Sequence, residues 1–283
     1  MKRIGFYDYY LDEWHANNYP AMFRKEIAKC GIDMEVSYAF SETDKPGGMS
    51  TEDWCKKYKC KNCASIEEFV ELCDFMLILA PSYPSEHERM AKLPLASRKP
   101  VYIDKIFSPD VETGRRIFEY ANIYKTPLFS SSALRFSDEL TDYRRGEGME
   151  AIWCATTGPS SFEVYAIHQI EMIQTVMGGC AKRVKAFENK GGRTVLFDYG
   201  NSMASMLQLD KLRFQITVSD GENCINNPII SPFFENLIKQ IIEFFYKPDP
   251  SPVSQNDTLS VMAMLHTAKL ALDNKDEWLD IIV

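Results

Sequence analysis

The chain contains 283 residues, of which 45% are hydrophobic and 25% are charged, proportions typical of a folded globular protein. Its net charge of −8, with no Lys/Arg-rich stripe, argues against a nucleic-acid partner. No apolar run approaches the roughly 20 residues that cross a bilayer, so no membrane association is predicted. The first residues lack a signal-peptide pattern, and a cytoplasmic location is therefore expected.

The first part of the chain, residues 1–130, is predicted to alternate strands and helices. The expected strands are residues 3–7, 34–40, 75–79, 101–104 and 128–131, and the expected helices are residues 19–30, 66–73, 86–95 and 111–122. Gly31 is a typical residue after a helix end, and Ser65 with Glu68 forms a capping-box pattern. This alternation favours a doubly wound parallel sheet with helices on both faces, a Rossmann-like domain.

The second part, residues 131–283, has the pattern of an α+β domain with an open mixed or antiparallel sheet. A helix at residues 165–177 is followed by strand-like runs at residues 183–188, 194–199, 205–209 and 214–218, then by helices at residues 232–246 and 258–272. Turn signals between the runs predict an antiparallel meander. The last helix is expected to pack back on the first domain. Cofactors and substrates commonly bind in clefts at domain junctions, so a cleft near residue 130 is the expected site.

Lys105 follows a short apolar strand. In an open parallel sheet, ligands bind beyond the carboxyl ends of the strands, where a lysine can reach a bound small molecule. The alternative interpretation is a solvated lysine paired with Asp104, because active-site lysines are a minority of lysines at strand ends.

The first turn lacks the glycines that allow backbone amides to approach a pyrophosphate. Only Gly5 is present, and Asp8, Asp12 and Glu13 would repel a phosphate. This argues against ordinary phosphate binding at the turn. A helix N-terminus can still attract an anion through its dipole.

His168 and Glu171 are separated by three residues on a predicted helix, so they share a face. A histidine beside a carboxylate suits general acid–base catalysis. The alternative is a half-buried histidine that is hydrogen-bonded to that glutamate.

Two further groups have competing interpretations. Cys55, Cys60 and Cys63, with Cys73 as a fourth ligand, have spacing that suits part of an iron–sulfur or zinc site. A second Cys-x2-Cys pair is absent from the sequence, so free thiols are favoured and no metal is predicted.

The aromatic residues near the first turn are either a stacking surface for a sugar or base, or packing residues; they are Tyr7, Tyr9, Tyr10, Trp14 and Tyr19.

Together these segments resemble the Gfo/Idh/MocA family of sugar and cyclitol dehydrogenases, over nearly the whole chain. Asp104-Lys105 stands where the family has its Glu-Lys-Pro motif, and Ala80-Pro81-Ser82 with His87 is similar to its Thr-Pro-Asn…His turn. Residues 132–136 resemble the entry to its second domain, and residues 166–171 resemble its Gly-Ile-His-x-Ile-Asp helix. The chain departs from the family pattern at the first turn, at Val164, where the family often has an aspartate, and at Ile106, where it has a proline.

The resemblance implies an oxidoreductase that moves a hydride between a sugar-like or cyclitol-like hydroxyl and NAD or NADP. It implies that Lys105 contacts the reacting hydroxyl and that His168 is the acid–base group. The implied cofactor contacts are Gly5, Tyr7, Glu42, Pro81, Ser82, His87 and Asp104, and the implied substrate contacts are Arg135, Glu163 and Glu171. The family often uses its second domain for oligomerisation, which implies a homodimer or homotetramer through that sheet.

Two alternatives to a dehydrogenase remain open at this stage. One is a binding or regulatory protein that kept the fold but lost the dinucleotide. The other is a non-redox enzyme, such as a lyase or hydrolase, that uses His168 and Lys105.

Overall fold

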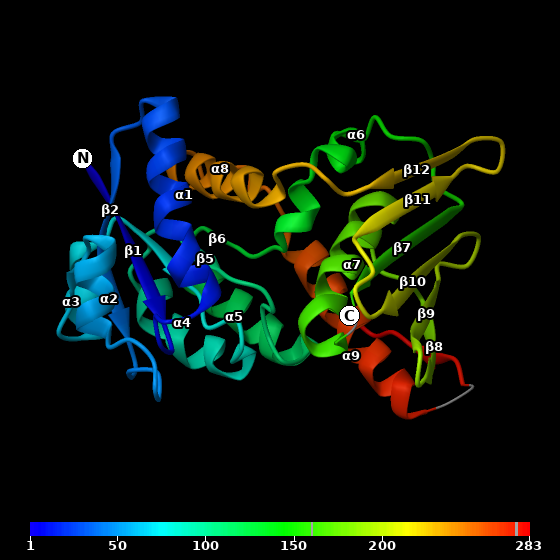
Figure 1. The fold of residues 1–283 in the computed structure, drawn as a ribbon, viewed down its shortest axis with the longest axis horizontal. Coiled ribbons are helices and arrows are strands. Elements are labelled where there is room, and N and C mark those ends of the chain that lie inside the picture. Colours follow the sequence, from blue (N-terminus) through cyan, green and yellow to red (C-terminus); the bar gives the residue numbers. More distant parts are fainter. Residues whose placement is uncertain (160, 275–276) are drawn as a thin grey trace. The chain divides into compact units, whose positions relative to one another are not determined.

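The structure is a computed structural model that describes residues 1–159, 161–274 and 277–283. The chain forms two compact units (Figure 1). The first comprises Met1–Ser131 and Leu237–Ser254, and the second comprises Ser132–Asn236 and Gln255–Val283. This grouping differs from the expected division at residue 130: Leu237–Ser254 belongs to the first unit, and the last helix belongs to the second.

The first unit contains a six-stranded parallel sheet in the order β3-β2-β1-β4-β5-β6. Its strands are β1 Lys2–Asp8, β2 Met34–Ser41, β3 Lys61–Asn62, β4 Phe75–Ile78, β5 Val101–Ile103 and β6 Leu128–Phe129. The strand order reverses between β1 and β4, as it does in doubly wound sheets. The predicted Rossmann-like sheet is therefore confirmed, with β3 as an additional edge strand.

The helices of the first unit are α1 Trp14–Cys30, α2 Thr51–Tyr58, α3 Ile66–Leu72, α4 His87–Ala96 and α5 Val111–Tyr124, together with most of α8 Phe233–Tyr246. Gly31 ends α1 in the left-handed region with φ 64°, and Ser65 caps α3 by accepting a hydrogen bond from the Glu68 backbone amide, as predicted. The prediction missed α2 and started α1 five residues too late, because Trp14 to Asn18 have no clear apolar period.

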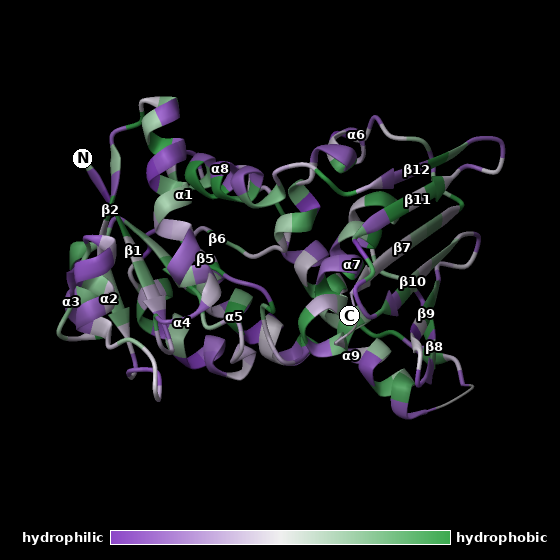
Figure 2. Ribbon diagram, viewed as in Figure 1, coloured by the Kyte–Doolittle hydropathy of each residue, from purple (hydrophilic) through white to green (hydrophobic). Residues whose placement is uncertain are grey.

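The core of the first unit lies on both sides of β1, β4 and β5. All residues of β4 and β5 are buried, which is typical of strands in a parallel sheet that is covered on both faces. Phe245 of α8 stacks on Phe75 with ring centroids 4.9 Å apart, and Phe244 contacts Phe129 edge-on at 4.7 Å. These ring contacts explain why Leu237–Ser254 groups with the first unit. Figure 2 shows apolar and polar residues alternating around α8, the pattern of an amphipathic helix.

The second unit contains a seven-stranded mixed sheet in the order β12-β11-β7-β10-β9-β8-β13. Its strands are β7 Trp153–Pro159, β8 Arg183–Asn189, β9 Gly192–Asp198, β10 Met203–Leu209, β11 Gln215–Ser219, β12 Cys224–Pro228 and β13 Leu279–Asp280. The predicted antiparallel meander holds for β8, β9 and β10 only. It is wrong for the next strand, because β7 lies between β10 and β11 and pairs with β10 in parallel.

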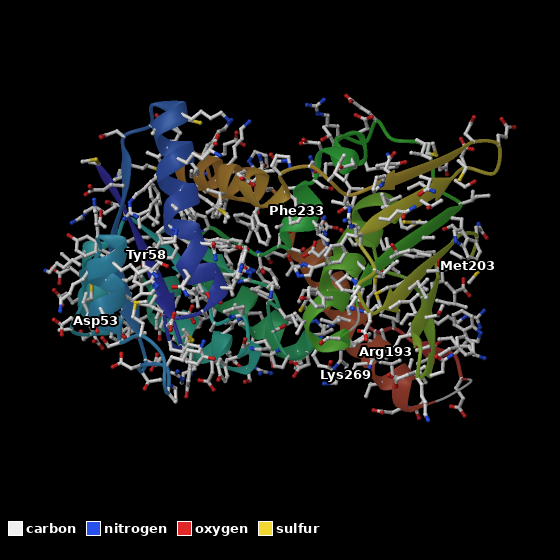
Figure 3. All side chains as sticks on the ribbon, in the orientation of Figure 1. Asp53, Tyr58, Arg193, Met203, Phe233 and Lys269 are labelled. Carbon is white, nitrogen blue, oxygen red and sulfur yellow. The ribbon has the colours of Figure 1, made fainter. Side chains whose placement is uncertain are left out.

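Helices α7 Phe162–Met177 and α9 Gln255–Asp273 pack against this sheet and against each other. The strands alternate buried residues with partly exposed ones, so one face of the sheet is covered. Three short helical segments precede β7: η2 Ala133–Phe136, η3 Asp138–Leu140 and α6 Thr141–Arg144. Side chains fill the space between sheet and helices in each unit, and Figure 3 labels Arg193 on β9 and Met203 at the start of β10.

Within the described residues, no helix has both the length and the apolar character required to span a membrane.

Candidate functional site

A cluster of ionisable side chains lies at the carboxyl ends of β1 and β5 in the first unit. Asp8 ends β1, Glu13 and His15 follow it in the chain, and Asp104 and Lys105 follow β5. The strand order reverses beside β1, and ligands of open parallel sheets bind next to such a reversal. The fold therefore places this cluster where a ligand is expected.

Asp104 holds His15. The Asp104 carboxyl is 1% exposed, and its Oδ2 lies 2.5 Å from His15 Nδ1. Its Oδ1 accepts a hydrogen bond of 3.1 Å from the Tyr102 hydroxyl, and its backbone N–H donates to the Ile78 carbonyl oxygen at 2.8 Å. Burial acts to raise the pKa of Asp104, but His15 and then Lys105 outweigh it and lower that pKa below its ordinary value. Asp104 is thus a carboxylate that orients the imidazole.

His15 lies in the first turn of α1 and is 8% exposed. The Tyr19 ring stacks on it at 5.1 Å, and the Trp14 indole meets it edge-on at 5.2 Å. The sequence did not indicate His15 as a site residue, because its carboxylate partner, Asp104, follows a strand that lies far along the chain. The available signal was that the first turn and the end of the strand at 101–104 meet at one sheet edge.

Asp8 is the second buried carboxyl of the cluster, at 1% exposure. Its Oδ1 accepts hydrogen bonds from the backbone amides of Tyr9 at 2.7 Å and Ala80 at 3.0 Å. Its Oδ2 is buried and has no hydrogen-bond partner among the residues that the structure describes. Burial, followed by the charges of Glu13 and Asp104, raises the pKa of Asp8 well above its ordinary value, although the two amides oppose the rise.

The N-terminus of α1 is capped by the chain's own carboxylate. Glu13 accepts hydrogen bonds from the backbone amides of His15 at 2.9 Å and Ala16 at 2.5 Å. Asp12 is held in the same loop by the Asn17 side chain and the Met49 amide, each at 2.9 Å. A dinucleotide pyrophosphate in this fold binds to the amides at the N-terminus of the first helix. Here two of those amides already bind Glu13, so the residues present do not fit a pyrophosphate at this place.

Gly5 also has a structural role. An added Cβ on Gly5 would overlap Cys73 Sγ and the Phe69 ring, so the glycine permits β1 to pack closely against these residues. Its location does not resemble a turn that approaches a phosphate.

Three tyrosines lie beside the ionisable cluster. Tyr9 and Tyr10 follow β1, and Tyr83 lies in the loop after β4. The rings of Tyr9 and Tyr83 lie 4.6 Å apart, and the Tyr10 ring meets Tyr83 edge-on at 5.7 Å. All three are partly exposed, which suits contact with the face of a sugar ring or another planar group.

Glu42, expected to contact a cofactor, lies in a partly exposed ion-pair network of the first unit. It accepts a hydrogen bond from the buried Tyr7 hydroxyl, and its Oε1 lies 3.1 Å from Arg89 Nη1. Arg89 also binds Glu86, with 2.9 Å between Nε and Oε2. Burial and then Glu42 raise the pKa of Tyr7. Both residues are therefore engaged within the protein.

The loop after β4 contains the other expected cofactor contacts. Pro81 is partly exposed and Ser82 is exposed, whereas His87 is fully buried. The His87 ring nitrogens lie 2.8 Å from the Leu79 carbonyl oxygen and 3.0 Å from that of Phe107. Burial lowers the pKa of His87, and its contacts with the two carbonyl oxygens join the loops that follow β4 and β5. His87 thus supports the segment that carries Lys105. The Lys105 side chain itself is half-buried.

In the second unit, His168 on α7 is half-buried and hydrogen-bonds through Nδ1 to Ser132 Oγ at 2.6 Å. Glu171 is buried; it pairs with Arg135 and accepts a hydrogen bond from the Ser132 backbone amide at 3.1 Å. Arg135 also donates to Gln174 at 2.5 Å. Ser132 therefore connects the two expected residues, a role that the sequence did not indicate.

The remaining expected substrate contact, Glu163, is exposed in the first turn of α7. Val164, at the position where the resembled family often has an aspartate, is also exposed. Arg135, by contrast, is 6% exposed. Its guanidinium forms a buried ion pair with Glu171 and is part of the interior of the second unit.

All eight cysteines have free thiols. Burial raises the pKa of Cys55 to about 12 and that of Cys63 to about 11, which makes both thiols poor nucleophiles. Over the described residues, no group of three or more His, Cys, Asp or Glu side chains could hold a metal ion.

Several solved structures resemble the whole chain. GenD2 from gentamicin A biosynthesis, in complex with NAD, aligns with a TM-score of 0.80 and 10% identity over 100% of this chain and 97% of its own. A candidate myo-inositol dehydrogenase from Sinorhizobium meliloti 1021 aligns with a TM-score of 0.75 and 15% identity over 100% of both chains. UDP-N-acetylglucosamine 3-dehydrogenase GnnA from Acidithiobacillus ferrooxidans aligns with a TM-score of 0.78 and 12% identity over 96% of this chain and 98% of its own.

At such identities the likeness establishes the fold: a Rossmann-like unit followed by a unit with a mixed sheet. No protein-family model matches the sequence, and no curated protein matches it either.

Proposed function

We propose that this chain binds a hydroxyl-rich small molecule, sugar-like or cyclitol-like, at the carboxyl edge of the first sheet, without a dinucleotide in the position usual for the fold. In this proposal it is a divergent relative of the Gfo/Idh/MocA family. The observation that carries the proposal is the Glu13 carboxylate on the amides of His15 and Ala16. A pyrophosphate would have to displace a carboxylate that is already hydrogen-bonded at the positive end of α1.

The composition of the edge supports an uncharged, hydroxyl-bearing ligand. Glu13 and Asp104 lie close enough for the charge of Asp104 to affect the pKa of Glu13, and these two carboxylates would repel a phosphate. Carboxyl groups and Lys105 are suitable hydrogen-bond partners for hydroxyls. The tyrosine cluster offers ring faces for the apolar side of a sugar or cyclitol.

The second candidate function is an NAD(P)-dependent oxidoreductase that acts on the same class of compound, with Lys105 and His168 as its catalytic residues. It is favoured by the whole-length likeness to dehydrogenases, among them GenD2 in complex with NAD. The position of Lys105, two residues beyond the end of β5, agrees with this candidate as well. The α1 cap counts against it, because the contacts that would hold the dinucleotide are occupied.

Binding measurements separate the two candidates. Saturation-transfer NMR with NAD+, NADH, NADP+ and NADPH at millimolar concentration is expected to show no transfer to the wild-type protein. The polyols myo-inositol and D-glucose, tested in parallel, are expected to show transfer, and Tyr83→Ala is expected to weaken it. The exposed variant Tyr246→Ala is the matched control. Dinucleotide binding with a submillimolar Kd would replace the first proposal with the second.

The partner that we propose for the second unit is another copy of the chain, in a homodimer or homotetramer formed through its sheet. Helices cover one face of the sheet, while Leu196 and Leu207, which alternate with buried neighbours, are partly exposed on the other. Partly exposed apolar side chains on a sheet face suit a subunit interface. Light scattering coupled to size exclusion should report an oligomer, and Leu207→Arg should shift it to the monomer. A monomeric wild-type protein would contradict this proposal.

A further inference from the structure

We propose that Asp8 and His15 are an acid–base pair that enolises a keto sugar or keto-cyclitol bound at the carboxyl edge of the first sheet. This inference rests on the proposed polyol binding and adds a reaction to it. The reaction is not a redox step and needs no dinucleotide.

The His15–Asp104 contact provides the base. Because Asp104 Oδ2 lies 2.5 Å from Nδ1, the ring is fixed in orientation, and the other ring nitrogen, Nε2, is the position from which it would accept a proton. The imidazolium formed on proton uptake would be stabilised by the buried carboxylate, as in other histidine–aspartate pairs. Tyr19 and Trp14 pack against the ring and further restrict its motion. Asp104 acts through His15 and is a positioning residue.

Asp8 provides the acid. Its Oδ1 is anchored by two backbone amides, whereas its buried Oδ2 has no partner among the described residues. A buried polar atom without a partner is costly, which favours a ligand atom that binds there. The raised pKa of Asp8 favours the protonated form, in which Oδ2 can carry a proton for a substrate oxygen.

The two carboxyls differ in their surroundings, and that difference assigns their roles. The lowered pKa of Asp104, which contacts His15, favours its ionised form, while the raised pKa of Asp8, whose Oδ2 is buried without a partner among the described residues, favours its neutral form. Neighbouring titratable groups whose pKa values are pushed apart are the usual source of an acid and a base in one site.

The proposed step is balanced without an oxidant or reductant. The His15 imidazole removes a proton from the carbon next to the ketone, and the electron pair of that C–H bond forms a carbon–carbon double bond. The π pair of the carbonyl takes the Asp8 proton, which gives an enol hydroxyl. The step leaves an imidazolium at His15 and a carboxylate at Asp8. Return of a proton to the original carbon from the opposite face gives an epimer of the substrate. Return of a proton to the former carbonyl carbon gives an isomer with the ketone at the neighbouring position.

Deuterium exchange tests the inference. The wild-type protein is incubated in deuterium oxide with D-fructose and with 2-keto-myo-inositol, and the proton next to the ketone is followed by NMR. We expect the protein to accelerate the loss of that signal for at least one compound. Asp8→Asn and His15→Asn should each slow the exchange by at least about 100-fold, a typical contribution of acid–base catalysis. Asp104→Asn should slow exchange while ketone binding is retained.

Matched controls are Asp33→Asn, at an exposed aspartate, and His266→Asn, at an exposed histidine of α9. Both should exchange at the wild-type rate. Circular dichroism checks that each variant is folded; Asp8→Ser and His15→Gln replace any that is not.

Binding of the same ketones by saturation-transfer NMR separates the two proposals. Binding without exchange, or undiminished exchange in the Asp8 and His15 variants, would overturn the acid–base inference alone. Absence of binding by any ketone or polyol would overturn the proposed function and this inference with it.

Discussion

Replacing Asp8 with asparagine is expected to make the stability of the protein less dependent on pH. Asparagine keeps the shape of the side chain and the acceptor for the Tyr9 and Ala80 amides, but it does not ionise. The wild-type carboxyl has a raised pKa in the folded protein, so its folded form binds a proton over a pH range in which the unfolded form does not. The difference between the variant and wild type reports the free energy linked to ionisation of this carboxyl, including its coupling to Glu13.

The sign and size of the effect follow from proton linkage. An unfolded aspartate ionises near pH 3.9, and above this the folded state holds one proton more than the unfolded state. The free energy of unfolding then falls by up to about 1.4 kcal/mol per pH unit, until the pH passes the folded pKa. Asp104 has the opposite behaviour: its lowered pKa contributes stability that is lost as the pH falls through its folded pKa. Burial also raises the pKa of Glu13, which changes stability in the same direction as Asp8, so the difference between Asp8→Asn and wild type is the quantity that reports on Asp8.

Urea unfolding followed by tryptophan fluorescence at pH 5, 6, 7 and 8 provides the measurement. We expect the stability of Asp8→Asn relative to wild type to rise with pH and then to level off at the folded pKa of Asp8. Asp33→Asn, at a side chain that is 82% exposed, should give a pH profile parallel to that of the wild type. Parallel profiles for Asp8→Asn and wild type would show that Asp8 ionises equally in both states and would refute the argument.

Three further substitutions test the contacts that position the site and the core. Glu13→Ala removes the cap of α1 and should lower the free energy of unfolding by about 1 kcal/mol in urea titrations, whereas an unchanged value would mean that water replaces the carboxylate at no cost. Arg135→Met leaves Glu171 charged and buried, so a loss of about 3–5 kcal/mol is expected, and adding Glu171→Leu should recover most of it. Phe245→Ala removes a buried ring that stacks on Phe75 and should cost about 3–5 kcal/mol; a loss below that of Phe245→Leu would contradict this packing role.

The local signals in the sequence were sufficient for most of the first unit. Apolar runs such as residues 75–79, the Gly31 helix end and the Ser65 cap depend on neighbours within one turn or strand, and each predicted element is present. The sheet of the second unit was harder to predict. The pairing of β7 with β10 joins residues far apart in the chain, and Gly158-Pro159 at the end of β7 are typical of turns rather than strands.

The features of the candidate site were likewise predictable only in part. The sequence by itself determined that Asp104 and Lys105 follow a buried strand, that the first turn lacks glycines, and that this turn is acidic and aromatic. Only the tertiary structure decided what those acids do: Glu13 caps α1, Asp104 holds His15, and Asp8 keeps one oxygen buried without a partner among the described residues. The reason is physical. A strand end and its polarity are local properties, whereas the partner and the pKa of a buried group depend on which distant segments fold around it.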